Sequence, residues 1–230
     1  MVDGMAIALF LTSVNSRSNA AQKHQRCVEV FLPQLRLNNE ISAASLFLPA
    51  ETSDPYVDDG APPELILQID LSSKEALVRL GVDAVFKNSI EGSLGGSINY
   101  EAFEVLNYNV VPGETAPPRT AQVSYNVRYL PPIKDANTFV DFYIENHVPI
   151  LKELPGIRNV ICYLPIAWHP PTDWECSGCI LGNETVFDSI ESLNAALASD
   201  VRHKLRDDYN AFPIKPGPNT HYAMLREDFS

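Results

Sequence analysis

Two stretches, ISAASLFLP at residues 41–49 and IRNVICYLP at residues 157–165, decide the fold of this chain. They lie 116 residues apart, and both are apolar segments that end on Leu-Pro. At the same distance, SKEAL at residues 73–77 recurs as SIESL at residues 189–193. In all, 12 identical pairs begin within residues 20–77, where composition alone gives about 4. The sequence therefore predicts two copies of one folding unit; the alternative is a coincidence among common residues.

Each copy has the pattern of a βαββαβ unit. In residues 122–130, apolar or aromatic residues alternate with polar ones, which is the period of a half-buried strand. In the first copy, strands are predicted at residues 6–14, 41–48, 64–71 and 98–107. In the second copy, they are predicted at residues 122–130, 157–164, 178–187 and 220–226. The helices are predicted at residues 21–37 and 138–154, and at residues 73–87 and 189–205.

The predicted fold class is α+β, with two tandem ferredoxin-like units. Such a unit forms an antiparallel four-stranded sheet with both helices on one face, and its other face is bare. The two units can pair their sheets into an α+β barrel within one chain, so a homodimer is an option rather than a requirement. The predicted domains are residues 1–110 and 120–230. Residues 111–119, with three prolines and a glycine, are the predicted linker.

The composition limits the classes of partner and the cell compartment. A net charge of −12 argues against nucleic acid and against an anionic membrane surface, because both are bound through Lys and Arg. The early apolar run at residues 5–11 is far shorter than the roughly 20 residues of a membrane span. It follows an acidic start, unlike a signal peptide. We expect a soluble, cytoplasmic protein with no nucleic-acid or membrane partner.

One helical segment carries a recognisable motif. Residues 142–157, FYIENHVPILKELPGI, contain an aromatic pair, His-x-Pro and Leu-Pro-Gly. This resembles the signature helix of the EthD-like family, a branch of the dimeric α+β barrel superfamily. FDSIESL at 187–193 and DYNAF at 208–212 also fit, so the resemblance covers most of residues 120–228. The first half has Phe31 in place of His147, so the resemblance implies one site, in the second half.

His147 and Tyr143 are the predicted catalytic residues. They are four positions apart and share a helix face. Pro149 has no N–H, so the carbonyl of Glu145 loses its helical partner and the helix is predicted to kink or end nearby. That would move His147 toward the space between helix and sheet, where it could act as general acid or base without a cofactor. The alternative is a core histidine bonded to a backbone carbonyl.

The predicted substrate-binding residues come from strands and from one loop. The strand candidates are Tyr125, Asn126, Arg128, Tyr163 and His221, and their alternative role is in the barrel interface or at the surface. Residues 168–174, WHPPTDW, form the tryptophan loop, which contributes Trp168, His169 and Trp174 as a predicted lid over an aromatic ligand. Its alternative is a loop packed on its own apolar patch. The counterpart in the first half, the acidic loop at residues 51–63, has a different composition.

Cys176 and Cys179 form a Cys-x-x-Cys pair without the context of a metal or redox site. Structural zinc requires four ligands, and only His169 is near in sequence. A redox pair favours a helix N-terminus, whereas a strand is predicted to follow here. We therefore predict two ordinary thiols and no metal.

The resemblance implies a cofactor-independent lyase or isomerase. Dehydration, decarboxylation, cyclisation or C–C cleavage of a small aromatic or polyketide-like molecule would fit, with His147 as the acid or base. Three alternatives stay open: a non-catalytic small-molecule-binding accessory protein of a catabolic or biosynthetic pathway, a cofactor-free oxygenase, and a barrel that binds haem through a histidine.

Overall fold

The computed structural model describes residues 6–14, 19–35, 37–110, 122–170 and 172–229, so the predicted linker at 111–119 lies outside the described residues. The first half contains β1 (Ile7–Val14), α1 (Ala20–Arg26), the π-helical turn η1 (Cys27–Phe31), α2 (Leu32–Leu35), β2 (Ile41–Pro49), β3 (Ile66–Leu71), α3 (Lys74–Gly81), α4 (Ala84–Leu94) and β4 (Ser97–Tyr108). The second half contains β5 (Val123–Tyr129), α5 (Ala136–Phe142), η2 (Tyr143–His147), α6 (Val148–Leu151), β6 (Ile157–Pro165), β7 (Glu175–Cys176), β8 (Leu181–Phe187), α7 (Ile190–Leu197), α8 (Asp200–Ala211) and β9 (Asn219–Phe229).

The repeat found in the sequence is present in the structure. A shift of 116 residues carries the bounds of β2 onto those of β6, and the bounds of α1, η1 and α2 onto those of α5, η2 and α6. The same shift carries α3 onto α7 and the start of α4 onto the start of α8. The prediction of tandem ferredoxin-like units is therefore confirmed.

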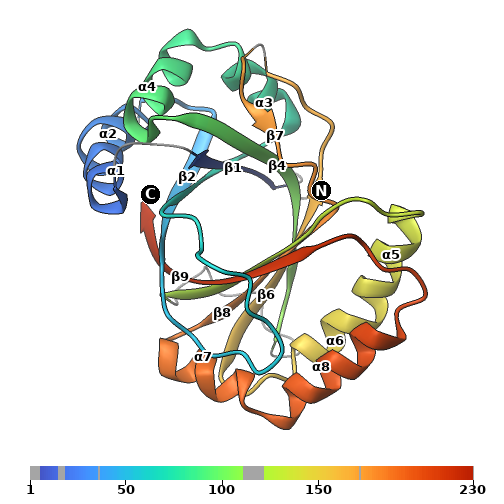
Figure 1. Cartoon of the computed structure of the whole chain (residues 1–230). Coiled ribbons are helices and arrows are strands. Elements are labelled where there is room, and N and C mark those ends of the chain that lie inside the picture. The colour runs from blue at the N-terminus through green and yellow to red at the C-terminus, as the bar shows by residue number, and fades with distance from the viewer. Residues whose placement is uncertain (1–5, 15–18, 36, 111–121, 171, 230) are drawn as a thin grey trace.

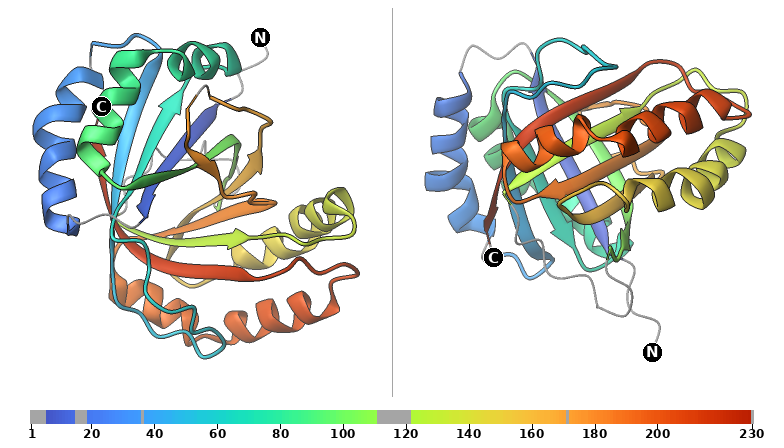
Figure 2. Two further views of the ribbon diagram at one scale, coloured as in Figure 1. Left: turned by 45° about the horizontal axis from the view of Figure 1, so that its top comes forward. Right: turned by 90° about the horizontal axis from the view of Figure 1, so that it is seen from below.

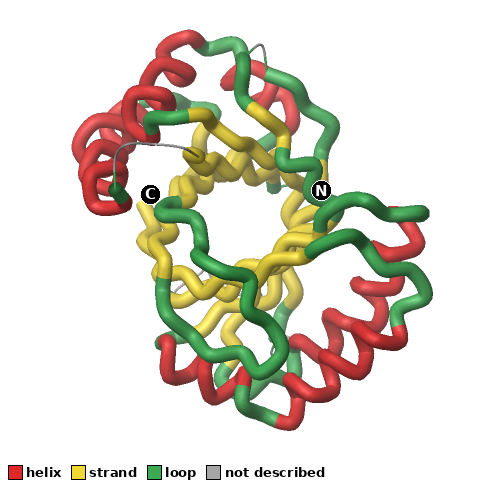
Figure 3. The backbone as a smooth tube through the Cα atoms, viewed as in Figure 1, coloured by secondary structure: helices red, strands yellow, loops and turns green. Residues whose placement is uncertain are grey.

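Within the described residues, eight strands close into an antiparallel barrel. The strand order is β1-β3-β2-β9-β5-β8-β6-β4, and the pairing of β4 with β1 completes the ring. The two units meet where β2 pairs with β9 and where β4 pairs with β6. Figure 3 shows the strands as a ring with the helices outside it. The short β7, which the sequence did not predict, pairs in parallel with β4.

Alternate residues of each strand face two different cores. The side facing the helices forms one apolar cluster in each half, and the barrel interior forms a third cluster that includes Phe10, Phe103 and Tyr163. In Figure 1 the helices of the first half lie above and to the left of the barrel, and those of the second half lie below and to the right of it. A strand such as β8 is buried along its whole length because both of its faces are covered.

The helices are shorter than predicted. The helix expected at residues 73–87 is two helices, because Asp83 accepts hydrogen bonds from the N–H groups of Val85 and Phe86 and starts α4 anew. The corresponding break in the second half lies between α7 and α8. None of the helices in the described ranges combines the length and the apolar character that crossing a bilayer requires.

Candidate functional site

His147 is the last residue of the π-helical turn η2. The N–H of Val148 bonds to the carbonyl of Tyr143, five residues back, so the helix widens by one residue just before Pro149. The sequence predicted a kink or an end here; instead the wider turn accommodates the proline and the helix continues into α6. Turns of this kind often occur at functional sites. The first half repeats the turn, as η1, before Pro33.

Asp208 on α8 holds the ring of His147. Its Oδ2 lies 2.7 Å from Nδ1 of His147, and both side chains are largely buried. Since a carboxylate only accepts, Nδ1 carries the proton, and in the neutral ring Nε2 keeps a free lone pair. Burial lowers the pKa of His147 below the usual histidine range, and the bond to Asp208 opposes this shift. The ring is therefore set up to accept a proton.

Tyr143 packs against His147 from one turn earlier. The two ring centroids are 4.7 Å apart, and Tyr143 is fully buried. Burial raises the pKa of Tyr143 well above its usual value, with the neighbouring Tyr129 adding to the shift. The phenol thus keeps its proton and can act as a hydrogen-bond donor, not as a base.

A cavity that is partly open to solvent lies beside this pair. It is bounded by the outer face of β5, β8 and β9 and by η2, α6, α7 and α8. The lining is mostly apolar and aromatic, with a few polar groups: Tyr125, Val127, Tyr129, Tyr143, His147, Leu151, Leu154, Asn183, Thr185, Leu193, Leu197, Arg202, Leu205 and His221. An adjoining cavity shares His147, Arg202 and His221 with it.

The acidic loop of the first half crosses to this cavity. Both carboxylate oxygens of Asp54 bind Arg202 on α8, at 2.9 Å each. The hydroxyl of Tyr125 on β5 donates to the same carboxylate at 2.9 Å. Figure 1 shows the loop leaving β2 and running over β9 toward the helices of the second half. The side chains of Asp54 and Arg202 are 2 % and 10 % exposed, so this ion pair is largely buried.

A second carboxylate of the acidic loop holds a second histidine. Oδ2 of Asp59 lies 2.9 Å from Nδ1 of His221 on β9 and also accepts the backbone N–H of that residue at 2.7 Å. Earlier in the same loop, Tyr56 contacts a ring nitrogen of His203 on α8. The loop therefore covers the site of the other half through several side chains.

Four of the predicted site residues meet at the cavity, and three lie elsewhere in the barrel. Tyr125, Tyr143, His147 and His221 line it. Asn126, Arg128 and Tyr163 were expected in the same pocket; they face the barrel interior instead, because neighbouring positions on a strand point to opposite faces. Arg128 pairs there with Glu101, and Tyr163 donates to Glu184.

The tryptophan loop covers the first half, not the cavity beside His147. Trp168 packs against Tyr100, with ring centroids 5.3 Å apart, and Trp174 donates from Nε1 to Glu91 on α4 at 3.0 Å. His169 lies near the Tyr100 hydroxyl. Pro171, within this loop, lies outside the described residues. The predicted lid is corrected accordingly. The tryptophan loop, between β6 and β8, crosses to the first half, and the acidic loop, between β2 and β3, crosses to the second half and covers the site (Figure 2).

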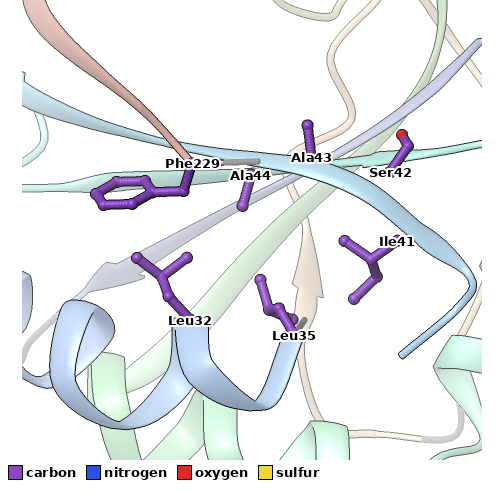
Figure 4. A pocket seen from close by; sticks show the side chains of 7 residues that line it. All are labelled: Leu32, Leu35, Ile41, Ser42, Ala43, Ala44 and Phe229. Atoms are coloured by element: carbon purple, nitrogen blue, oxygen red, sulfur yellow. The ribbon is translucent and has the colours of Figure 1, made fainter. Parts of the chain in front are cut away.

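Within the described part of the first half, the position that corresponds to His147 is apolar. Phe31 occupies the shifted position of His147 and is buried in the first-half core. A shallow pocket nearby is lined by apolar residues of α2 and β2, by Ser42 and by Phe229. In Figure 4, Leu32 and Leu35 on α2 lie opposite Ala44 and Phe229. The two halves are therefore chemically unequal.

Sequence reasoning missed several polar residues of the site, among them Asp54, Asp59, Arg202 and Asp208. Asp208 had a signal, since it opens the DYNAF segment that fits the family pattern. For Asp54 and Asp59, the sequence showed only that residues 51–63 are acidic. That composition does not indicate where the loop lies in the fold. The remaining candidates for special chemistry, Cys176 and Cys179, lie on β7 and in the barrel interior, and burial raises the pKa of Cys179.

No protein-family model matches the sequence, and no curated protein matches it significantly. Several solved structures are similar. An anthrone oxidase-like protein has 14 % sequence identity and a TM-score of 0.68, covering 100 % of this chain and 94 % of that chain. A proposed monooxygenase from Fusobacterium nucleatum has 12 % identity and a TM-score of 0.58 over 98 % and 94 % of the two chains.

An EthD family protein from Bacillus halodurans is similar over 44 % of this chain and 95 % of its own, with 25 % identity and a TM-score of 0.37. The two longer likenesses extend over nearly the whole chain and show the fold. The chain therefore has the dimeric α+β barrel fold that the EthD-like resemblance implies, closed here within a single chain.

Proposed function

We propose that this protein is a small-molecule enzyme in which His147 moves a proton on an aromatic or polyketide-like substrate, in a lyase or isomerase reaction. The observation that carries the proposal is the pairing of His147 with Asp208 at the wall of a cavity. A carboxylate on Nδ1 fixes the tautomer and stabilises the imidazolium that forms when Nε2 takes a proton.

The lining of the cavity supports an aromatic substrate. Tyr129 and Tyr143 contribute aromatic side chains to the lining, and Leu151 and Leu193 contribute apolar ones. The acidic loop lies over the site, which limits access of water during the reaction. The similarity to an anthrone oxidase-like protein supports anthrone as a first probe molecule, because anthrone is flat, aromatic and acidic at its C10 carbon.

The chemistry of the chain's own residues follows from these positions. Nε2 of His147 takes a proton from the substrate while Asp208 stabilises the resulting charge. Tyr143, which keeps its proton, forms a side-chain hydrogen bond with Tyr129 in the same wall of the site. Return of the proton from His147 to another substrate atom, or to a leaving hydroxyl group, would complete an isomerisation or a dehydration.

The test is deuterium exchange at C10 of anthrone under anaerobic conditions, followed by NMR. Wild type should exceed the uncatalysed rate, and His147→Gln should lose at least about 100-fold of the enzymatic rate. His24→Gln, on α1 of the first half, is the matched control and should retain it. Binding of anthrone without exchange would contradict the proposal and favour an accessory binding protein. Oxygen consumption on admission of air would favour the oxygenase.

A further inference from the structure

We infer that His221 is a second proton-transfer residue of the same cavity and that Asp59, supplied by the first half, is its positioning residue. This inference rests on the function proposed for His147. It makes the site a joint product of both halves of the chain.

The geometry of His221 parallels that of His147. Both rings line the same two cavities, and both have Nδ1 within 2.9 Å of a carboxylate oxygen. With Nδ1 bound to Asp59, Nε2 is the ring nitrogen left to serve a ligand. The side chain of His221 is 12 % exposed, so it is reached through the cavity and not from an open surface.

The carboxylate that holds His221 is itself fixed. Oδ2 of Asp59 accepts the backbone N–H of His221 as well as the ring nitrogen. The hydroxyl of Tyr222, the next residue on β9, donates to the backbone carbonyl of Asp59 at 3.4 Å. A side chain and the main chain of β9 therefore fix the position of Asp59 together. This rigidity is what a positioned acid or base requires.

The charged and titratable groups around His221 come from three elements. Asp59 and Asp54 face it from the acidic loop, Arg202 from α8, and Tyr125 from β5, with its ring centroid 5.9 Å away. Burial is the main cause that lowers the pKa of His221, and Asp59 opposes it. Burial is also the main cause that lowers the pKa of His147, and the charge of Arg202 lowers it further. The two imidazoles are thus matched in environment.

Two such groups on one cavity can perform a balanced proton shift. One neutral imidazole takes a proton as a substrate C–H bond breaks, and the electron pair moves through the conjugated system onto a carbonyl oxygen. The other imidazole, in its protonated form, gives its proton to that oxygen. For anthrone, C10 loses the proton and the carbonyl oxygen gains one, which is conversion of the keto form to the enol. No oxidant or reductant is needed.

The alternative role for His221 is to tie down the acidic loop. His221→Gln separates the two roles, because an amide N–H can still donate to Asp59 but cannot carry a proton to the substrate. Asp59→Asn tests the positioning role in the same way. Asp58→Asn, an exposed neighbour in the same loop, is its matched control, and His24→Gln is the control for the histidine change.

The experiment measures the keto-to-enol rate of anthrone anaerobically across pH. His221→Gln should lower kcat at least about 10-fold with little change in KM. In wild type the rate should fall as pH rises through the lowered pKa of His221, below the usual histidine range, since the protonated imidazole is lost there, and this fall should disappear in His221→Gln. Asp59→Asn should lower kcat, and adding it to His221→Gln should cost nothing further. Both controls should match wild type.

The outcomes separate this inference from the proposed function. A rate that depends on His147 but not on His221 overturns the second role alone. A rate that depends on neither overturns the proposed function as well. A substrate-free check is the NMR titration of His221: in His147→Gln its pKa should rise, because a competing positive charge has been removed from the cavity. An unchanged titration would count against a shared site.

Discussion

Asp54 in the acidic loop of the first half binds Arg202 on α8 of the second half through both of its carboxylate oxygens. The tryptophan loop makes the reverse crossing, where Trp174 donates to Glu91 on α4. Each unit therefore covers the helical side of the other. Because the loops differ in chemistry, one half acquires carboxylates over a cavity, and the other acquires indole rings in its core.

Asp54→Ala should destabilise the protein by about 3 kcal/mol, because it leaves the largely buried guanidinium of Arg202 without its partner. The measurement is chemical denaturation of both proteins at neutral pH. Asp58→Ala, in the exposed part of the same loop, should change the free energy of unfolding by less than about 0.5 kcal/mol. Equal effects of the two substitutions would show that the Asp54–Arg202 contact contributes nothing specific.

The free energy of unfolding should decrease as pH falls from about 7.5 to about 5.5. Burial lowers the pKa values of His147 and His221 in the folded state, so the unfolded chain binds more protons in this interval. Stability is then complete above the ordinary histidine pKa and is lost as pH falls toward the folded values. The double variant His147→Gln, His221→Gln should have a shallower slope in denaturation series at several pH values. An unchanged slope would rule out this linkage.

Glu184→Gln should lower the free energy of unfolding by about 3 kcal/mol. Its carboxylate, fully buried in the barrel, accepts from Ser124, Tyr163 and Arg226. An amide cannot accept at its nitrogen and leaves the buried Arg226 with less compensation. Denaturant unfolding is the measurement, and Glu175→Gln on the exposed β7 is the control. A loss below about 1 kcal/mol would show that Arg226 is satisfied without Glu184.

Phe31→His should destabilise the first half by about 3 kcal/mol, since it removes a buried ring and buries an unpaired polar group. The shifted counterpart of Asp208 is Gly92, where an added Cβ meets no atom within 4 Å. Adding Gly92→Asp should recover part of the loss by pairing the new histidine. A double-mutant cycle from thermal or denaturant unfolding measures the coupling. Strictly additive changes would show that the two positions do not meet as His147 and Asp208 do.

Much of the site was predictable where the signal was local. The four-residue spacing of Tyr143 and His147, ahead of Pro149, placed both on one wall of the cavity. The strand candidates were not separated by face in the prediction, although the period of β5 implies that Tyr125 and Asn126 point to opposite sides. The kink predicted at Pro149 is a widened turn, in which the N–H of Val148 bonds to the carbonyl of Tyr143, five residues back.

The sequence by itself determined the repeated unit, the barrel class and the chemical difference between the two halves. These follow from the strand period and from the 116-residue repeat, and both can be read directly from the order of the residues. Only the tertiary structure decided which loop covers which site. Asp54 and Arg202 are 148 residues apart, and they meet because β2 pairs with β9 when the barrel closes. The composition of a loop limits which groups it can bind, but only the closure of the barrel determines which groups lie close enough to be bound.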